Sequence, residues 1–519
     1  MKKMIEIVFL ENELWYGGAV AFGEKYPKGK EDEFSINLSF NQTYNQLNPV
    51  FFSNKGRYIW FENGGRVSFN RGIIQIDAPS YELNNAGGTL KDAVLAAANK
   101  HYPPTGTMPD KRAFEGPQYC SWVVLLWHQN QQSLLQYARG IVEKGYKPGI
   151  FIIDDTWQKA YGVWEFNREY FPEPEKMIRE LKDMGFLVAL WLAPYVSPDM
   201  PYISEDAPGI FRHIEEKRVI MDDKGERPLI CYWWEGFSAV LDFRNESAKE
   251  WINSQAKRLE RKYGISGFKL DGGDPPYLGI EYLDGNLLNS LWIESIDSDL
   301  KEARCCYKLG GQPIIQRLND KAHIWESDDS VYLRLGLSSL LPLIMAQGVS
   351  GYYYGCADMV GGGLSSDFID KESLDDELII RWCQASALLP IIQFSLDVWN
   401  REKNRVAECC RKALDLRQKL LPYLLELLEN ASHTGIPAIR YMEFDYPNQN
   451  LEGIKNQFML GEKYLVAPVL KKGATSREVR FPCGMWRDFE NGKVYEGGRS
   501  AVVDAPIDKL PVFEKIKGI

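Results

Sequence analysis

The sequence predicts an α/β protein in which a (β/α)8 barrel lies between an N-terminal β-sandwich-like domain and a C-terminal β-domain. From residue 114 onward, apolar strand-like runs alternate with amphipathic helical stretches that end at glycine, as in a parallel barrel. On both sides of this region, short alternating segments separated by turns indicate antiparallel sheets. We therefore expect domains at residues 1–113, 114–435 and 436–519.

The first 113 residues have the texture of short β-strands broken by turns. The candidate strands are IEIVFL, SINLSF, GRYIWFE and RVSFNRGIIQIDA. Gly and Asn between them suit turns, so we expect an antiparallel sandwich or half-sandwich. The stretch HYPPTGTMPDKR (101–112) is rich in Pro and polar residues and is expected to link this domain to the barrel.

Eight strand candidates follow, which is the number that closes a (β/α)8 barrel. In order they are CSWVVLLW (120–127), GIFIIDD (149–155), FLVALWLAPYV (186–196), GISGFKLD (264–271), QPIIQRL (312–318), HIWESD (323–328), VSGYYYG (349–355) and LLPIIQF (388–394). The stretches between the first three are amphipathic and end at Gly, as barrel helices do. An open doubly wound sheet is the alternative, but no GxGxxG or Walker motif follows the early strands.

The chain returns to strand texture after a long amphipathic stretch around residues 405–431. We assign that stretch to the last barrel helix. The strand candidates beyond it are FMLGEKYLVAPVL, REVRFPCGMWRDF and GKVYEGG. They predict the C-terminal β-domain.

Composition restricts the class of protein. A chain of 519 residues has room for about three average domains, and 45% hydrophobic with 25% charged residues is a globular composition. A formal net charge of −10 without a long basic run argues against nucleic acid or an anionic membrane as a partner. The aromatic content of 13% favours a carbohydrate enzyme, because aromatic faces stack on sugar rings.

Cysteine usage and the lack of long apolar runs predict the compartment. Nine cysteines without a CxxC pair indicate reduced thiols. The N-terminal stretch MKKMIEIVFLENE is interrupted by Glu6 and Glu11 and is followed by no small-residue cleavage site. No apolar run approaches the length of a membrane span. We expect a soluble, cytoplasmic protein, and the sequence leaves a homo-oligomer open.

Acidic residues dominate the carboxyl ends of the predicted barrel strands, where the active site of such a barrel lies. They are Asp154 and Asp155 after strand two, Asp271 and Asp274 after strand four, Asp328 and Asp329 after strand six, and Asp358 after strand seven. Trp191 and Tyr195 follow strand three, Arg317 follows strand five, and Lys269 is the other nearby base. An acidic, aromatic mouth suits a neutral polyol whose hydroxyls donate to carboxylates. It favours glycoside cleavage, which needs two carboxyl groups and no cofactor or metal.

Six segments, from residue 117 to the C-terminus, resemble glycoside hydrolase family 31. They are NREYFPEP (167–174), LDFRN (241–245), FKLDGGD (268–274), RWCQASALLP (381–390), FMLGEKYLVAPVL (458–470) and FPCGMWRDFENGKVYEGG (481–498). The resemblance implies a retaining α-glycoside hydrolase that acts on a small carbohydrate substrate by double displacement, without a cofactor.

The family's nucleophile stands in a Lys-x-Asp phrase at the end of strand four, which here reads Lys269-Leu270-Asp271. Lys269 would point to the same side of the strand and lower the pKa of the Asp271 carboxyl. Asp274 matches an acidic position of the family that would orient sugar hydroxyls or the nucleophile. Taken alone, the phrase also fits a buried strand that ends in a turn Asp.

The family's acid/base phrase W-x-G-D corresponds to Trp325-Glu326-Ser327-Asp328-Asp329. Anchoring on Trp325 selects Asp328, whereas counting back from Pro342 along the following helix selects Asp329. We expect Asp328 to be the acid/base, because the tryptophan is closer and no gap is needed. Asp329 would then cap the helix that follows.

Two phrases point towards galactose within the family. IDDTWQ (153–158) resembles the Asp-Asp-Gly-Trp phrase of related α-galactosidase families, whose paired acids grip O4 and O6 of galactose. Trp325-x-Ser-Asp-Asp likewise resembles the acid/base phrase of those families. The whole chain is also similar to the α-galactoside-linked branch of the family named after the myogenesis-regulating glycosidase, with DMVGG (358–362) as one shared phrase. The resemblance implies these substrate-binding residues: Asp154, Asp155, Trp157, Trp191, Lys269, Asp274, Arg317, Trp325 and Asp358. As an alternative role, the adjacent acids would cap a following helix.

The segment PIIQFS (390–395) departs from the α-glucosidase pattern, since it lacks the hydroxyl-binding His found there. This favours an α-galactosidase over an α-glucosidase or α-xylosidase with the same mechanism. A lyase would share these residues, and a catalytically inactive carbohydrate-binding protein is the alternative from a different class.

Overall fold

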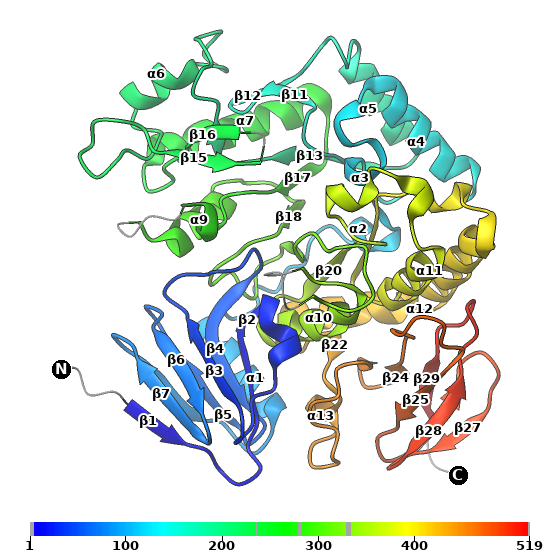
Figure 1. The fold of residues 1–519 in the computed structure, drawn as a ribbon. Coiled ribbons are helices and arrows are strands. Elements are labelled where there is room, and N and C mark those ends of the chain that lie inside the picture. The colour runs from blue at the N-terminus through cyan, green and yellow to red at the C-terminus, as the bar shows by residue number, and fades with distance from the viewer. Residues whose placement is uncertain (1–4, 235, 279–282, 329–333, 517–519) are drawn as a thin grey trace.

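The protein, described by a computed structural model over residues 5–234, 236–278, 283–328 and 334–516, is a closed barrel with a β-domain at each end of the chain (Figure 1). The barrel strands are β9 (Gln118–Cys120), β10 (Ile150–Ile153), β13 (Leu187–Leu192), β17 (Gly267–Leu270), β18 (Lys301–Ala303), β19 (Ile315–Arg317), β20 (Tyr354–Met359) and β21 (Ile391–Phe394). Each pairs in parallel with the next, and β21 pairs with β9 to close the ring. The predicted eight-stranded barrel is confirmed.

The strand assignment is wrong at three of the predicted strands and misses one true strand. Beyond Cys120 the first predicted strand becomes a helical turn, α3 (Trp122–Leu125), and residues 323–328 form no barrel strand. The predicted seventh strand (349–355) overlaps β20 only at its end, because the preceding helix and a turn occupy its start, so Asp358 lies within β20 rather than after it. The fifth strand is β18, which the sequence analysis missed. As a result Arg317 ends the sixth strand rather than the fifth, and Asp328 lies in the loop beyond it.

Helices surround the barrel (Figure 1). They are α4 (Gln131–Glu143), α5 (Pro174–Asp183), α7 (Glu246–Tyr263), α8 (Pro275–Leu278), α9 (Gly285–Glu294), α10 (Leu340–Val349), α11 (Asp376–Ser386) and α12 (Val406–Thr434). Local signals set their ends: Asn130 forms a capping box with Ser133 at the start of α4, and Gly435 ends α12 in the left-handed conformation. The long helix predicted around 405–431 is therefore confirmed as α12.

Two insertions extend the carboxyl ends of the barrel strands. The hairpin β11 (Gln158–Ala160) and β12 (Val163–Phe166) follows β10. A three-stranded sheet follows β13, built from β14 (Tyr195–Val196), β15 (Ile230–Trp233) and β16 (Gly236–Val240), with α6 (Gly209–Glu215) inserted. The short 3₁₀ turns are η1 (Val20–Lys25), η2 (Leu126–His128), η3 (Leu337–Ser339), η4 (Ser365–Phe368), η5 (Lys371–Ser373), η6 (Val398–Asn400) and η7 (Lys403–Arg405).

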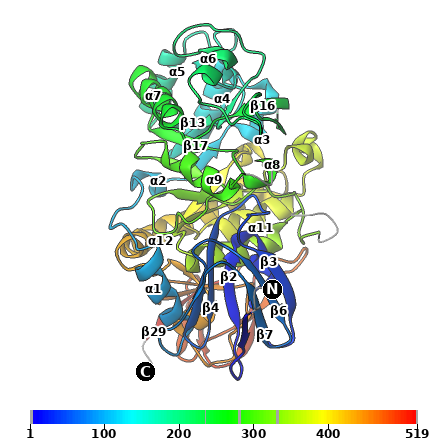
Figure 2. The ribbon, with the colours of Figure 1, turned by 90° about the vertical axis from the view of Figure 1, so that its left-hand side faces the viewer.

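The N-terminal domain is a sandwich of two antiparallel four-stranded sheets, which lies below the barrel in Figure 2. One sheet has the order β1 (Ile5–Val8), β7 (Ile73–Asp77), β6 (Arg66–Asn70) and β3 (Glu33–Asn37). The other has the order β2 (Trp15–Ala19), β4 (Leu47–Ser53), β5 (Arg57–Trp60) and β8 (Glu82–Asn85). The stretch up to residue 113 is not all strand, because α1 (Leu90–His101) starts at a Thr89–Asp92 capping box and α2 (Arg112–Glu115) follows.

The C-terminal domain is also built of antiparallel strands. Its larger sheet has the order β22 (Ile439–Arg440), β23 (Phe458–Leu460), β24 (Tyr464–Val466), β29 (Val512–Ile516), β26 (Met485–Asp488) and β27 (Val494–Glu496), and α13 (Met442–Asp445) follows β22. The smaller sheet pairs β25 (Ser476–Arg480) with β28 (Ser500–Asp504). Trp486 and Phe513 are fully buried in the domain's core.

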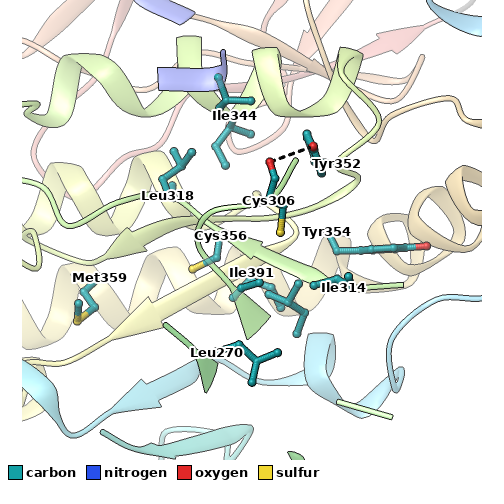
Figure 3. Close-up of a cluster of buried hydrophobic side chains, with 14 of the residues drawn as sticks. Leu270, Cys306, Ile314, Leu318, Ile344, Tyr352, Tyr354, Cys356, Met359 and Ile391 are labelled. Carbon is teal, nitrogen blue, oxygen red and sulfur yellow. Dashed lines mark hydrogen bonds between the residues drawn. The ribbon is translucent and has the colours of Figure 1, made fainter. Parts of the chain in front are cut away.

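Buried side chains fix the orientation of β17, the strand that precedes Asp271. Leu270 on β17 lies in a cluster with Cys356, Ile391 and other side chains of the barrel (Figure 3). Because side chains alternate along a strand, Lys269 and Asp271 point to the opposite side from Leu270, into the barrel mouth. All nine cysteines are free thiols, and eight of them are buried. Among the described helices, none is both long and apolar enough to cross a bilayer.

Candidate active site

A cavity of about 250 Å³ lies at the carboxyl ends of the barrel strands, and most of its wall is carboxylate or aromatic. Its carboxylates are Asp154, Asp155, Asp271 and Asp320, and its cations are Lys269 and Arg304. Its aromatic residues are Tyr44, Trp122, Trp191, Trp233, Trp234 and Tyr277. Strand-end reasoning predicted the first three carboxylates, Lys269 and Trp191. The rest of this set comes from loops and short helices, from the inserted strand β15, from the residue after the missed strand β18 and from the N-terminal domain.

Asp271 follows β17, and several donors hold its carboxylate. Arg304 Nε and the Gly272 N–H each donate to Oδ1 at 2.9 Å, and Trp191 Nε1 donates to Oδ2 at 3.3 Å. Burial would raise the pKa of Asp271, but the positive charges of Arg304, Lys269 and Arg317 outweigh it and hold the pKa well below its usual value. The carboxylate is therefore ionised, as a nucleophile must be.

Arg304, one residue beyond β18, contacts Asp271 directly and was missed by sequence reasoning. Its Nη2 donates to Asp274 Oδ2 at 2.8 Å, so the guanidinium bridges Asp271 and Asp274. Burial raises the pKa of Asp274 to about 6, against the lowering effect of Arg304. The Asp274 side chain is fully buried and positions Arg304 from behind rather than lining the cavity.

Lys269 has a different partner from the expected one. Its Nζ donates to Asp154 Oδ2 at 2.6 Å, and Cys120 Sγ lies 3.0 Å from the same oxygen. Lys269 does lower the pKa of Asp271, as predicted, but its effect is smaller than that of Arg304. The direct ion pair fixes Asp154 in the cavity wall.

Both members of the adjacent acid pair line the cavity, as predicted for a strand end. The Tyr161 hydroxyl donates to Asp155 Oδ2 at 2.7 Å, and Gln158 Nε2 donates to Oδ1 at 2.8 Å. Burial raises the pKa of Asp155 to about 6 despite these donors. The next element is strand β11, so the alternative in which the pair caps a following helix is wrong.

Stacked aromatic rings form one wall of the cavity. Trp233 stacks on Tyr195 with centroids 4.4 Å apart and lies nearly parallel to Trp191 at 6.0 Å. Trp157 was expected to contact the sugar, but it is fully buried and does not line the cavity. Its Nε1 donates to the Trp191 carbonyl at 2.9 Å, so Trp157 supports the wall from behind.

Arg317 and Asp358 lie beneath the cavity rather than in its wall. Arg317 Nη1 donates to Asp320 Oδ1 at 2.6 Å and to Asp358 Oδ1 at 2.9 Å. Both Arg317 and Asp358 are buried, and burial raises the pKa of Asp358. Only Asp320, which the sequence analysis did not single out, presents its carboxylate to the cavity.

The described part of the predicted acid/base phrase, residues 325–328, does not line the cavity. Trp325 Nε1 donates to Asp375 Oδ2 at 3.0 Å and so ties its loop to the N-cap of α11. The backbone N–H of Asp328 donates to the Arg334 carbonyl at 2.9 Å. Neither Trp325 nor Asp328 belongs to the described residues that line the cavity, and Asp329 falls outside the described residues.

The N-terminal domain completes the cavity through the loop at residues 41–46. Tyr44 lines the cavity, and its carbonyl accepts from Arg304 Nη1 at 3.4 Å. Asn45 and Asn319 form a reciprocal pair at 2.7 Å, and Gln46 Nε2 donates to the Arg317 carbonyl at 2.9 Å. Within the described ranges no cluster of His, Cys, Asp and Glu has the arrangement of a metal site.

Comparison with known proteins places this geometry in a family. The model described as "Glycosyl hydrolases family 31 TIM-barrel domain" matches residues 107–285 and 319–427, and the family's C-terminal domain model matches 435–519. The myogenesis-regulating glycosidase of Mus musculus is 30% identical over 423 residues, covering 79% of this chain and 57% of the relative. α-Glucosidase 2 of Bacillus thermoamyloliquefaciens is 26% identical over 515 residues, covering 91% and 62%.

The fold agrees with solved structures of that family. A Flavobacterium johnsoniae GH31 dextranase complexed with glucose superposes with a TM-score of 0.82 at 20% identity, covering 99% of this chain and 66% of that chain. The chain thus spans less than two thirds of each of these relatives, so it corresponds to part of their length.

Proposed function

The chain belongs to glycoside hydrolase family 31, and we propose that it is a retaining α-glycosidase that releases terminal α-linked galactose by double displacement. The observation that carries the proposal is the Asp271 carboxylate, held ionised by Arg304 at a cavity of about 250 Å³. The mechanism requires such a carboxylate to attack the anomeric carbon.

In the first step the glycosidic C–O bond breaks while Asp271 forms a covalent glycosyl ester, and an acid protonates the leaving oxygen. In the second step the conjugate base of that acid removes a proton from a water molecule. The water then cleaves the ester to Asp271, which restores the original anomeric configuration. We propose Asp328 as this acid/base, on the family phrase that it matches. Asp329 is the second choice.

The cavity wall supports a hydroxyl-rich substrate. Asp154, Asp155 and Asp320 present carboxylates to the same space as Asp271, and a carboxylate can accept hydrogen bonds from sugar hydroxyls. We assign Asp154 and Asp155 to the hydroxyls that distinguish galactose, because IDDTWQ resembles the phrase that reads them in α-galactosidase families. A hydrogen bond to a charged group contributes roughly 1.5–3 kcal/mol.

An α-glucoside or α-xyloside is the second candidate, since a relative that aligns with 91% of this chain is named an α-glucosidase. Hydrolysis of a panel of 4-nitrophenyl α-glycosides of galactose, N-acetylgalactosamine, glucose and xylose tests both. We expect kcat/KM to favour the galactoside over the glucoside by about tenfold or more, which is about 1.4 kcal/mol of transition-state discrimination. Faster hydrolysis of the glucoside would refute the galactose assignment and leave the proposed retaining mechanism in place.

A lack of turnover on every member of the panel would instead favour the catalytically inactive carbohydrate-binding protein. Release of an unsaturated product would identify a lyase. The cytoplasmic location and a homo-oligomeric state are further proposals, which fractionation of the source cells and sedimentation of the purified chain would test.

A further inference from the structure

Three tryptophans from two separate segments adjoin at the mouth of the cavity. Trp122 and Trp127 belong to the helical turns α3 and η2, and Trp234 lies between β15 and β16. The Trp122 and Trp234 rings meet edge to face at 5.2 Å, and Trp127 is 5.9 Å from Trp122 and 6.2 Å from Trp234. We call these three residues the tryptophan platform.

The platform leads from the cavity to the surface. Trp122 is 7% exposed, Trp234 is 40% exposed and Trp127 is 50% exposed. Trp122 and Trp234 line the cavity, whereas Trp127 extends the same group of rings beyond it. Trp122 is fixed in place, because its Nε1 donates to the Gly363 carbonyl at 3.2 Å.

Trp127 and Trp234 are adjoining, partly exposed indoles, and contiguous exposed apolar groups of this kind mark binding surfaces. The indole presents a flat face without a formal charge, which packs against apolar groups. The axial C–H groups of a sugar ring form such a surface. The platform therefore suits the apolar face of a sugar ring.

The size of the cavity identifies which part of the substrate reaches the platform. Pockets for drug-sized ligands have volumes of roughly 300–1,000 Å³. With about 250 Å³ beside Asp271, this cavity holds little more than the glycosyl residue that is transferred. The leaving group must then lie in the mouth, where Trp122 and Trp234 begin the platform.

We propose that the tryptophan platform binds the leaving-group side of an oligosaccharide by stacking, so that the substrate carries further sugar rings beyond the scissile bond. This inference rests on the proposed α-glycosidase activity and adds the class of aglycone. Continuity of the platform with the cavity at Trp122 and Trp234 carries the argument.

The experiment compares a substrate with no sugar in the leaving group with one that has two. α-Galactosyl fluoride is paired with raffinose, and α-glucosyl fluoride is paired with isomaltotriose. The pair used for the variants is the one whose fluoride the wild type hydrolyses. Trp127→Ala should lower the ratio of kcat/KM on the trisaccharide to that on the fluoride by about tenfold, or about 1.4 kcal/mol.

Two further variants separate stacking from a general effect. Trp127→Phe keeps an aromatic face and should recover most of the ratio. Phe211→Ala removes an aromatic side chain that is 79% exposed on α6, outside the platform, and should leave the ratio at its wild-type value. A ratio that changes by less than about twofold in an active Trp127→Ala enzyme overturns the platform.

A calorimetric titration keeps the two proposals apart. If the wild type hydrolyses neither fluoride, the proposed function fails, and the affinity of the full chain for raffinose and isomaltotriose then tests the platform directly. Trp127→Ala should weaken that binding by about tenfold. Equal affinities of wild type and variant, or no binding of either trisaccharide to the wild type, would overturn the inference.

Discussion

Replacing Arg304 by Gln should raise the pKa of Asp271 and move the acid limb of the pH–activity profile upwards. Arg304 lies 2.9 Å from one Asp271 oxygen and 2.8 Å from one Asp274 oxygen. The three side chains are 11%, 15% and 0% exposed, so solvent screens them little. Gln keeps hydrogen-bonding capacity but removes the positive charge.

The magnitude follows from the contact. Two unit charges about 4 Å apart interact with about 4 kcal/mol at an effective dielectric constant near 20. Lys269 and Arg317 remain beside Asp271 in the variant, and we take about half of that energy as the loss. About 2 kcal/mol corresponds to a rise of roughly 1.5 units in the pKa of Asp271.

Stability should respond with a defined sign. In the wild type the pKa of Asp271 is depressed in the folded state, so the group stabilises the fold above its unfolded pKa of about 3.9 and loses this contribution as pH falls through its folded pKa. The variant should therefore be less stable at neutral pH by about 2 kcal/mol or more. The difference should stay constant down to the folded pKa of Asp271 in the variant and narrow only below that pH.

Two measurements check this: kcat/KM on an aryl glycoside between acidic and neutral pH, and urea unfolding over the same range. Arg401→Gln is the matched control, since Arg401 pairs with Asp376 at 2.6 Å with side chains 19% and 11% exposed, outside the cavity wall. The control should lose stability without moving the acid limb. An unmoved acid limb in active Arg304→Gln would refute the assigned role of Arg304.

Three further predictions concern the chemistry and the sugar. Asp271→Ala should lower turnover by more than about a thousandfold without unfolding, and the wild type should first release the α-anomer, seen by NMR; initial β-anomer would exclude retention. Asp328→Asn should slow substrates with poor leaving groups far more than activated aryl glycosides, and if Asp329→Asn does so instead, the acid/base role passes to Asp329. Asp154→Ala and Asp155→Ala should each lose galactoside activity by about tenfold or more while circular dichroism stays native; unchanged rates would remove both from the sugar site.

The barrel and part of its mouth follow from the sequence because most of its strands are apolar runs that end in acids. β18 escapes this reasoning because Glu302 points into the barrel, where it pairs with Arg317 at 3.7 Å and accepts from Gln393 Nε2 at 3.3 Å. A buried polar network has no hydrophobic pattern to detect. Missing β18 meant missing Arg304, which directly follows it.

An apolar run outside the barrel strands explains why a helical turn was predicted as a strand. The WVVL run at Trp122 is a helical turn, although its composition suits a strand. Trp233 and Trp234 lie on an inserted hairpin and Tyr44 belongs to another domain, so only tertiary structure brings them to the cavity. Hydrophobic periodicity and residue spacing along the sequence carry no information on contacts between segments that lie far apart in the sequence.

The loop at residues 41–46 has a consequence for how these domains can be exchanged. It supplies Tyr44 to the cavity, and its neighbours Asn45 and Gln46 bond to the segments that carry Asn319 and Arg317. A hybrid joined near residue 113 would set a foreign loop against this barrel and leave those buried amides unmatched. The N-terminal domain and the barrel therefore have to match each other. Only chimeras that exchange both together should keep the cavity wall complete.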